Sequence, residues 1–94
     1  MNNYELLFII NSALEDEARE AVISKFTAIV TDNGGTIDTV DKWGVRKLAY
    51  TINHKNDGFY VLINFSAAPT VPAEIERVLN ITDTVIRFLL INKN

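Results

Sequence analysis

Residues 36–65 read TIDTVDKWGVRKLAYTINHKNDGFYVLINF, and this stretch decides the fold. Two runs rich in β-branched and aromatic residues, 36–52 and 59–65, flank the polar segment NHKNDG at 53–58. Such side chains favour strands, and the Asp-Gly pair that closes the polar segment is typical of a tight turn. The stretch therefore predicts two antiparallel strands joined by a short turn.

The first of these strands cannot be regular throughout. Ile37 stands at an odd position, whereas Val40, Leu48 and Tyr50 stand at even positions, and alternate residues of a strand point to opposite faces. A bulge or kink between the two sets is needed to bring them to one face, and Gly44 is the residue that can host it.

Outward from this pair, the apolar runs YELLFII at 4–10 and TVIRFLLI at 84–91 predict two further strands. Helical spacing of apolar residues predicts one helix at 15–32 and a second that opens at 69–72, with Thr70 as its N-cap. The order β-α-β-β-α-β is that of an α+β ferredoxin-like split β-α-β sandwich, with two helices on one face of a four-stranded antiparallel sheet. One domain spanning all 94 residues is expected.

The first helix has signals at both ends. Ser12 and Glu15 have the spacing of a capping box, and the segment 33–35, Asn-Gly-Gly, supplies the left-handed residues that end a helix. Its buried stripe is expected at Ala18, Val22, Phe26, Ile29 and Val30.

Alternation divides the strands into two faces. The aromatic-rich set is expected to face the helices: Tyr4, Leu6, Phe8, Ile10, Phe59, Val61, Ile63, Phe65, Ile86, Phe88 and Leu90. The helix-free face then carries Glu5, Leu7, Ile9, Tyr60, Leu62, Leu89 and Ile91. This is more apolar surface than a small monomer usually exposes, so the second set is predicted to bind a protein partner.

Charge is unevenly distributed along the chain, whose formal net charge is −3. Residues 1–41 carry two basic and eight acidic side chains, 42–55 carry four basic and none acidic, and 56–94 carry three basic and four acidic. The middle segment has the composition of an anion-binding surface: Lys42, Trp43, Arg46, Lys47, His54 and Lys55. An ordinary solvated hairpin is the alternative interpretation.

Composition excludes several classes of protein. With no cysteine and one histidine, the chain is not expected to hold a disulfide framework, a metal site or a cofactor. His54 falls in a polar turn, and the acidic cluster 15–17 is accounted for by the helix N-terminus, so no catalytic residue and no enzyme is predicted. Neither a signal peptide nor a membrane-length apolar run is present, which predicts a soluble intracellular protein.

Five segments carry a family resemblance: Tyr4-Glu5-Leu6-Leu7-Phe8-Ile9, Asn33-Gly34-Gly35, Trp43-Gly44-x-Arg46-Lys47-Leu48-Ala49-Tyr50-x-Ile52, Gly58-Phe59-Tyr60 and Leu79-x-Ile81-x-Asp83-x-Val85-Ile86-Arg87. In this order and spacing the chain resembles bacterial small-subunit ribosomal protein six. The resemblance implies a cytoplasmic, structural protein of the small ribosomal subunit. It also implies binding to the central domain, or platform, of the small-subunit rRNA, together with a basic partner, small-subunit ribosomal protein eighteen. Members usually have Arg or Lys where Asn2 and Asn3 stand here, and some add an acidic tail that this chain lacks.

On this interpretation the residues expected to bind rRNA are Lys42, Trp43, Arg46, Lys47, His54, Lys55 and Arg87. Neighbours on a strand point to opposite faces. We expect Arg46 on the side of Leu48 and Tyr50, with Tyr50 in the core, and Lys47 on the helix-free side. Trp43 is expected either to stack on a base or to fill the bulge beside Gly44.

The isolated protein is expected to be a monomer that binds rRNA weakly. Four phosphate contacts from the basic segment correspond to a log-log salt slope of only about −3 to −4. The competing class is a ferredoxin-like small-molecule sensor or self-associating regulatory domain, which would form a homodimer through its sheet.

Overall fold

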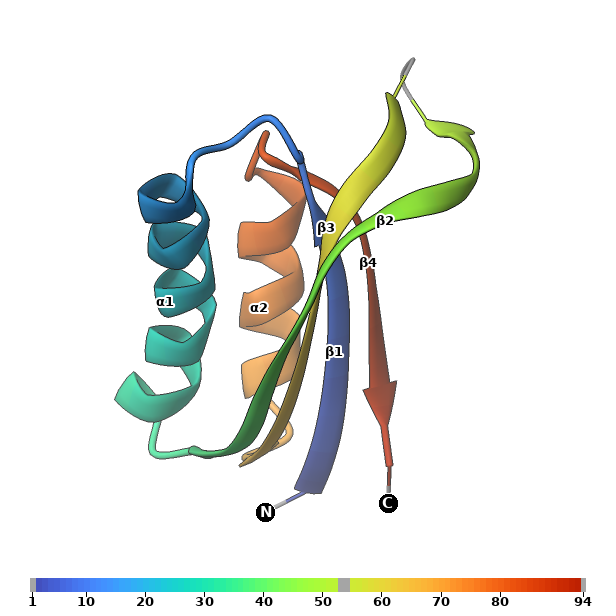
Figure 1. Cartoon of the computed structure of the whole chain (residues 1–94). Coiled ribbons are helices and arrows are strands. Elements are labelled where there is room, and N and C mark those ends of the chain that lie inside the picture. The colour runs from blue at the N-terminus through green and yellow to red at the C-terminus, as the bar shows by residue number, and fades with distance from the viewer. Residues whose placement is uncertain (1, 53–54, 94) are drawn as a thin grey trace.

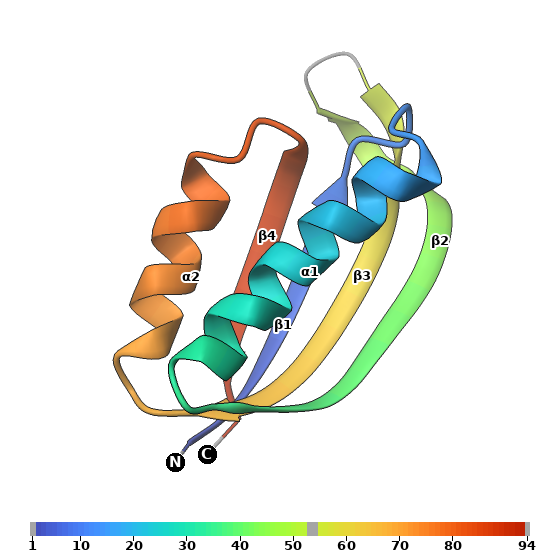
Figure 2. The ribbon, with the colours of Figure 1, turned by 90° about the vertical axis from the view of Figure 1, so that its left-hand side faces the viewer.

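The computed structural model describes the backbone of residues 2–52 and 55–93 and the side chains of residues 2–47 and 57–93. Its elements follow one another as β1 (Asn2–Ile10), α1 (Asp16–Asp32), β2 (Thr36–Ile52), β3 (Lys55–Ala67), α2 (Val71–Asn80) and β4 (Val85–Asn92). Both helices lie on one face of the sheet and leave the other face without a helix (Figures 1 and 2). This is the predicted β-α-β-β-α-β order.

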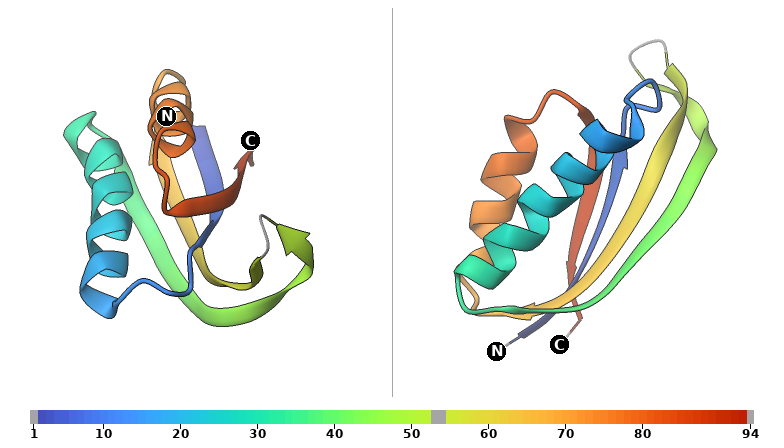
Figure 3. Two further views of the ribbon diagram at one scale, coloured as in Figure 1. Left: turned by 90° about the horizontal axis from the view of Figure 1, so that it is seen from above. Right: turned by 60° about the vertical axis from the view of Figure 1, so that its left-hand side comes forward.

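The strands are ordered β2-β3-β1-β4, and every neighbouring pair is antiparallel. The two apolar runs that begin at residues 4 and 59 occupy the centre, where a strand is paired along both edges, and the more polar β2 is an edge strand. The β2–β3 hairpin extends beyond the helices at the end of the molecule away from both termini (Figures 1 and 3). The described part of the basic segment continues along β2 into this extension.

The core lies between the sheet and the helices, and alternation predicted most of it. Phe8, Ile10, Val61, Ile63 and Phe65 are almost fully buried, as expected for the helix-facing set. The ring of Phe8 packs edge-on against the ring of Phe26 in α1, with 5.2 Å between centroids. This arrangement adds to the stabilisation that the buried apolar area gives.

The stripe of α1 differs from the predicted one at its start. Ile23, Phe26 and Val30 are buried, whereas Ala18 is exposed. One turn before Ile23 the stripe continues at Arg19, whose guanidinium Cζ lies 4.2 Å from the ring centroid of a core-facing aromatic residue, Phe59. The aliphatic stem of an arginine can cover apolar surface, so the stripe begins at the charged Arg19 and not at the predicted Ala18.

Two of the expected helix caps lack the expected side-chain bond. Ser12 donates its hydroxyl hydrogen to Asp57 Oδ1 at 2.6 Å, which ties the β1–α1 turn to β3, and Glu15 is the N-cap of α1 without a side-chain hydrogen bond. The prediction of a capping box formed by Ser12 and Glu15 is therefore wrong. Thr70 is the N-cap of α2 as predicted, also without a side-chain bond.

The Asp-Gly pair does not form the predicted turn. Asp57 pairs with Lys47 and Gly58 with Arg46, so both belong to β3, and the turn itself falls on residues outside the described part of the chain. Gly58 is buried, and a Cβ added to it would lie 2.3 Å from Cγ2 of Ile9. Glycine is required here for a close approach of two strands and not for a turn.

The bulge predicted at Gly44 is present. The register of β2 against β3 shifts between Lys42 and Gly44, and Gly44 adopts φ +87°, a conformation that L side chains rarely take. A second shift lies between Ile37 and Thr39, where no glycine marks it.

Strand β4 also shifts register against β1, between Ile9 and Ile10. Val85 pairs with Ile10 and packs against the core, whereas Arg87 pairs with Ile9 on the helix-free face. The assignment of Ile86 to the helix-facing set is therefore wrong, because this irregularity moves the core position one residue toward the N-terminus.

Candidate functional site

The helix-free face of the sheet carries the candidate functional surface. Leu62, Leu7 and Leu89 form one cross-strand row over β3, β1 and β4, and Glu5 pairs with Ile91 in the next row. Leu89 and Ile91 are 55% and 42% exposed, although both are large apolar side chains. The structure thus brings these predicted partner-binding residues together as one apolar surface, which we call the leucine face.

Ile9 supports this face from beneath. It lies between Tyr60 of β3 and Arg87 of β4 and is only 8% exposed. Its γ2 methyl fills the space that a side chain on Gly58 would need. Ile9 was predicted to meet a partner, but its burial makes it a packing residue of the surface.

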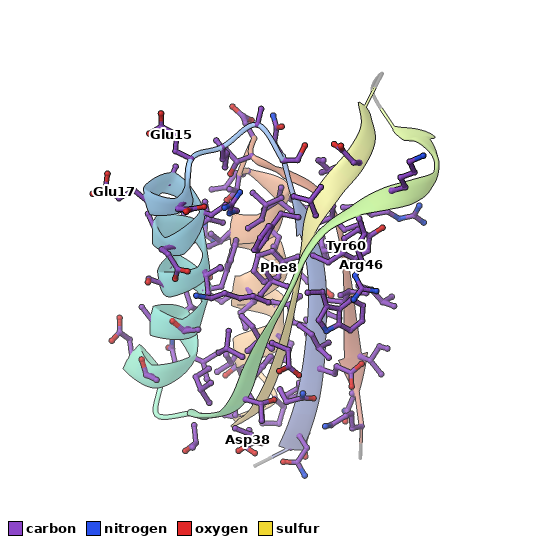
Figure 4. All side chains as sticks on the ribbon, viewed as in Figure 1. Phe8, Glu15, Glu17, Asp38, Arg46 and Tyr60 are labelled. Carbon is purple, nitrogen blue, oxygen red and sulfur yellow. The ribbon has the colours of Figure 1, made fainter. Side chains whose placement is uncertain are left out.

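A basic and aromatic cluster borders the leucine face at the hairpin end. The rings of Trp43 and Tyr60 are stacked, with 6.2 Å between centroids and 9° between planes, and Arg46 Cζ lies 5.2 Å from the Trp43 centroid. Figure 4 places Arg46 and Tyr60 on the side of the sheet away from the helices. We call Trp43, Tyr60 and Arg46 the aromatic-arginine stack.

The two remaining described cations of the hairpin lie on the other side. Lys42 pairs with Val61, a core residue, and its ammonium forms an ion pair with Glu20 of α1. Lys47 pairs with Asp57, whose alternation places it on the helix side of β3. Neither lysine joins the surface that carries the aromatic-arginine stack.

The predicted orientations of Arg46 and Lys47 are therefore reversed. A single bulge in β2 would have placed Arg46 with the core set. The shift after Ile37 already brings Ile37 and Val40 to the helix side, so the second shift, at Gly44, turns the following even-numbered positions to the helix-free side. The side chains of Leu48, Tyr50 and Lys55 and all of His54 lie outside the described residues.

Polar and acidic residues lie along the β2 side of this face and at its end away from the hairpin. Asp41 lies on β2 opposite Leu62, in the same row as the leucines, and Asp38 lies at the far end of the same strand (Figure 4). Asn64 donates to Thr39 Oγ1 at 2.9 Å and accepts a hydrogen bond of 2.9 Å from the Lys93 ammonium. Sequence reasoning missed Asp41 on this surface, because the unmarked shift after Ile37 decides which way it points.

The described residues offer little to enzymatic chemistry. Among residues 2–52 and 55–93, no group of three or more potential ligands could hold a metal ion. Glu15 and Glu17 project outward from the start of α1, as Figure 4 shows, and Asp16 is paired with Arg19. A hollow of about 450 Å³ at the junction of α2 and β4 is lined by Asp83 and Arg87 among others.

No helix of the described chain is long and apolar enough to cross a membrane.

These features define a class of protein: an α+β ferredoxin-like sandwich whose exposed sheet face is suited to bind macromolecules. The family model for Ribosomal protein S6 matches residues 3–92. The chain belongs to the ribosomal protein S6 family.

Relatives cover nearly the whole chain. Small ribosomal subunit protein bS6 of Clostridium novyi (strain NT) is 53% identical over 92 residues, which are 98% of this chain and 97% of the relative. The bS6 protein of Moorella thermoacetica (strain ATCC 39073 / JCM 9320) is 48% identical over 96% of this chain and 92% of its own length. The crystal structure of 30S ribosomal protein S6 from Thermotoga maritima superposes with a TM-score of 0.92 at 31% identity, covering 98% of this chain and 87% of that one.

Family membership confirms three predictions. The chain is a protein of the small ribosomal subunit, its fold is the ferredoxin-like split β-α-β sandwich, and the family is one of structural ribosomal proteins and not of enzymes.

Proposed function

We propose that this protein binds the central domain of the small-subunit rRNA together with a basic protein, small-subunit ribosomal protein eighteen, and that it is a monomer when isolated. The observation that carries the proposal is the division of one sheet face into three zones. The aromatic-arginine stack lies at the hairpin end, the leucine face lies in the middle, and acidic and polar residues lie beside it on β2 and at the far end.

The hairpin end is the proposed RNA surface. Residues 42–55 contain four cations and no acid, and phosphate contacts depend on Lys and Arg. β2 is an edge strand, so an RNA strand lying along this edge can meet side chains from both faces. Such an arrangement accommodates Arg46 on one side and Lys47 on the other. The proposed rRNA-binding set also includes Lys42, Trp43, His54, Lys55 and Arg87.

Lys42 contributes less than its charge suggests. Its ammonium is ion-paired with Glu20, and an exposed pair must separate or be shared before a phosphate can be bound. We therefore assign Lys42 a weaker contact than Arg46 within the proposed set.

The leucine face is the proposed partner surface. Its half-exposed Leu89 and Ile91 represent apolar area that a partner can bury. Glu5 lies within this surface and Asp41 beside it, so a basic protein is complementary in charge as well as in apolarity. Glu5, Leu7, Tyr60, Leu62, Leu89 and Ile91 form the proposed contact set, with Ile9 beneath.

Filter binding to a central-domain rRNA fragment tests the proposal. The protein is titrated alone and with the basic partner between 50 and 200 mM salt, about the range over which phosphate contacts weaken strongly. We expect weak binding alone and much tighter binding with the partner. Tight, salt-resistant binding by the protein alone, or no effect of the partner, contradicts the proposal.

A matched pair of variants locates the RNA surface. Arg46→Ala removes a cation from the hairpin end, and Arg77→Ala removes another exposed arginine from α2 in the helix layer, where it is paired with Glu74. Only the first is expected to weaken RNA binding. Sedimentation of the pure protein tests the monomer, and a stable homodimer contradicts it.

A further inference from the structure

We infer that Trp43 and Tyr60 form a rigid aromatic platform that holds the Arg46 guanidinium for a phosphate of the rRNA backbone, and that no base stacks on Trp43. Trp43 is thus a positioning residue, and Arg46 makes the contact. This inference rests on the proposed function and specifies how one of its contacts is made.

The bulge in β2 is what assembles the platform. Trp43 and Arg46 are three residues apart, and in a regular strand such residues point to opposite faces. The register shift between Lys42 and Gly44, with φ +87° at Gly44, brings both side chains to the helix-free face. The left-handed conformation of Gly44 thus brings the side chains of Trp43 and Arg46 to the same face of the sheet.

The neighbours of Arg46 direct it onto the tryptophan. Its cross-strand partner on β3 is Gly58, which has no side chain to contact it. The Arg46 Cζ instead lies 5.2 Å from the Trp43 centroid, and Trp43 is in turn stacked on Tyr60 with nearly parallel rings. Both contacts use the π-surface of Trp43, which a base would need for stacking, although 40% of the residue remains exposed.

The platform holds Arg46 without neutralising it. Arg19, Lys42 and Arg77 are each ion-paired with a carboxylate, whereas no carboxylate of the described residues pairs with Arg46. Stacking on a ring leaves the planar guanidinium with its N–H donors directed outward and its charge intact. A free arginine side chain loses rotamer entropy on being ordered, and the platform imposes part of that cost before the ligand arrives.

Phosphate fits this group better than a carboxylate of the protein partner. Arg46 lies at the hairpin end, within a segment of four cations and no acid, while Asp41 lies before this segment opposite Leu62 and Asp38 lies at the other end of β2. A basic partner is attracted to the acidic end, and an RNA backbone is attracted to the hairpin.

A double-mutant cycle measures the coupling between platform and guanidinium in rRNA binding with the partner present. Arg46→Ala is expected to weaken binding about tenfold, as for a charged hydrogen bond, and to reduce the salt slope by about one. Trp43→Leu is expected to weaken binding about fivefold in the native background and less than twofold in the Arg46→Ala background. If a base stacks on Trp43, the two losses multiply, which overturns the inference.

Two controls separate positioning from general damage to the hairpin. Arg46→Lys retains the charge but not the planar stacking, so its salt slope is expected to stay native while its affinity becomes insensitive to Trp43→Leu. Val45 lies between Trp43 and Arg46 in sequence, pairs with Phe59 on the helix side and is exposed, so Val45→Ala is expected to bind as the native protein does. A loss of slope in Arg46→Lys, or a loss of affinity in Val45→Ala like that of Trp43→Leu, contradicts the inference.

A spectroscopic measurement needs no variant. The chain has one tryptophan, so 5-fluorotryptophan incorporated into this protein alone gives a single ¹⁹F resonance. With the platform intact, rRNA is expected to shift that resonance only slightly, whereas direct stacking of a base gives a large ring-current shift and overturns the inference.

The proposed function and this inference fail in different ways. If the native protein and its partner do not bind the rRNA, both are overturned. If they bind and the two losses multiply, only the platform is overturned. If Arg46→Ala weakens pairing with the partner in the absence of RNA and leaves RNA affinity unchanged, Arg46 binds a carboxylate and the assignment to phosphate is wrong.

Discussion

Leu89→Ala tests whether the leucine face binds the protein partner. The substitution removes three carbons, worth about 0.8 kcal/mol each when fully buried. Because Leu89 is 55% exposed in the isolated protein, about 1.3 kcal/mol of that burial is left for a partner to supply. This corresponds to a loss of about ninefold in the affinity for the partner at 25 °C.

Ile81→Ala is the matched control. Ile81 ends α2 in the helix layer and is 65% exposed, so it is another large apolar side chain with a similar free surface. From the buried remainders, Leu89→Ala and Ile81→Ala are expected to reduce the free energy of unfolding by about 1.1 and 0.8 kcal/mol respectively. The two variants therefore match in stability and differ in the face that they alter.

Isothermal titration calorimetry with the basic partner measures both affinities, and urea unfolding checks both stabilities. Only Leu89→Ala is expected to lose affinity, with a less negative heat-capacity change of binding because less apolar area is buried. Equal losses in the two variants, or native affinity in Leu89→Ala, refute the assignment of the leucine face.

Three further predictions concern folding stability. Gly58→Ala is expected to lower the free energy of unfolding by about 1–3 kcal/mol through overpacking against Ile9, and Ile9→Ala in the same chain should remove most of that additional loss; additive losses in urea unfolding contradict the clash. Gly44→Ala meets no atom within 4 Å but must adopt φ +87°, so a loss of about 1–2 kcal/mol and altered tryptophan fluorescence are expected, and a neutral result contradicts strain at the bulge. The hydrogen bond from Arg77 lowers the pKa of Glu74. The native protein is therefore expected to be slightly more stable than Glu74→Gln above the ordinary carboxyl pKa, and this difference is expected to vanish as the pH falls through the lowered pKa. A stability difference that grows in acid contradicts the pairing.

Local patterns predicted the architecture because each element carries its own signal. The apolar run before Ile10 and the run after Gly58 have the composition of central strands, and the glycines after Asn33 end α1 where expected. The glycine at position 44 correctly indicated where a bulge lies, although the parity change between Ile37 and Val40 is produced by the other register shift, after Ile37. Strand composition, helix ends and the glycine of a bulge depend on residues that are close in sequence, so they can be predicted without the tertiary structure.

Errors arose where a distant segment changed a local preference. Ser12 has the spacing of a cap but bonds Asp57, which is 45 residues away. The Asp-Gly sequence at Gly58 is typical of a turn, but a glycine is needed there because Ile9 of a neighbouring strand leaves no space for a side chain. In each case a contact with a segment distant in sequence determines the role of the residue, and the local pattern does not.

The orientation of the candidate site was the hardest part to predict. The shift after Ile37 has no glycine to mark it, yet it decides the faces on which Arg46 and Lys47 lie. One undetected register shift inverts every later assignment on the strand, because side chains alternate with a period of two.

By itself, the sequence determined the order of the elements, the leucine face and the basic character of the hairpin, because composition and periodicity are local properties of the chain. The family resemblance came from five short motifs and their order in the chain. Only the tertiary structure decided that Arg46 packs on the aromatic rings, that Ile9 lies beneath the leucine face and that Gly58 allows two strands to pack closely. Those outcomes depend on strand register, and register is set by the pairing of segments that are far apart in the sequence.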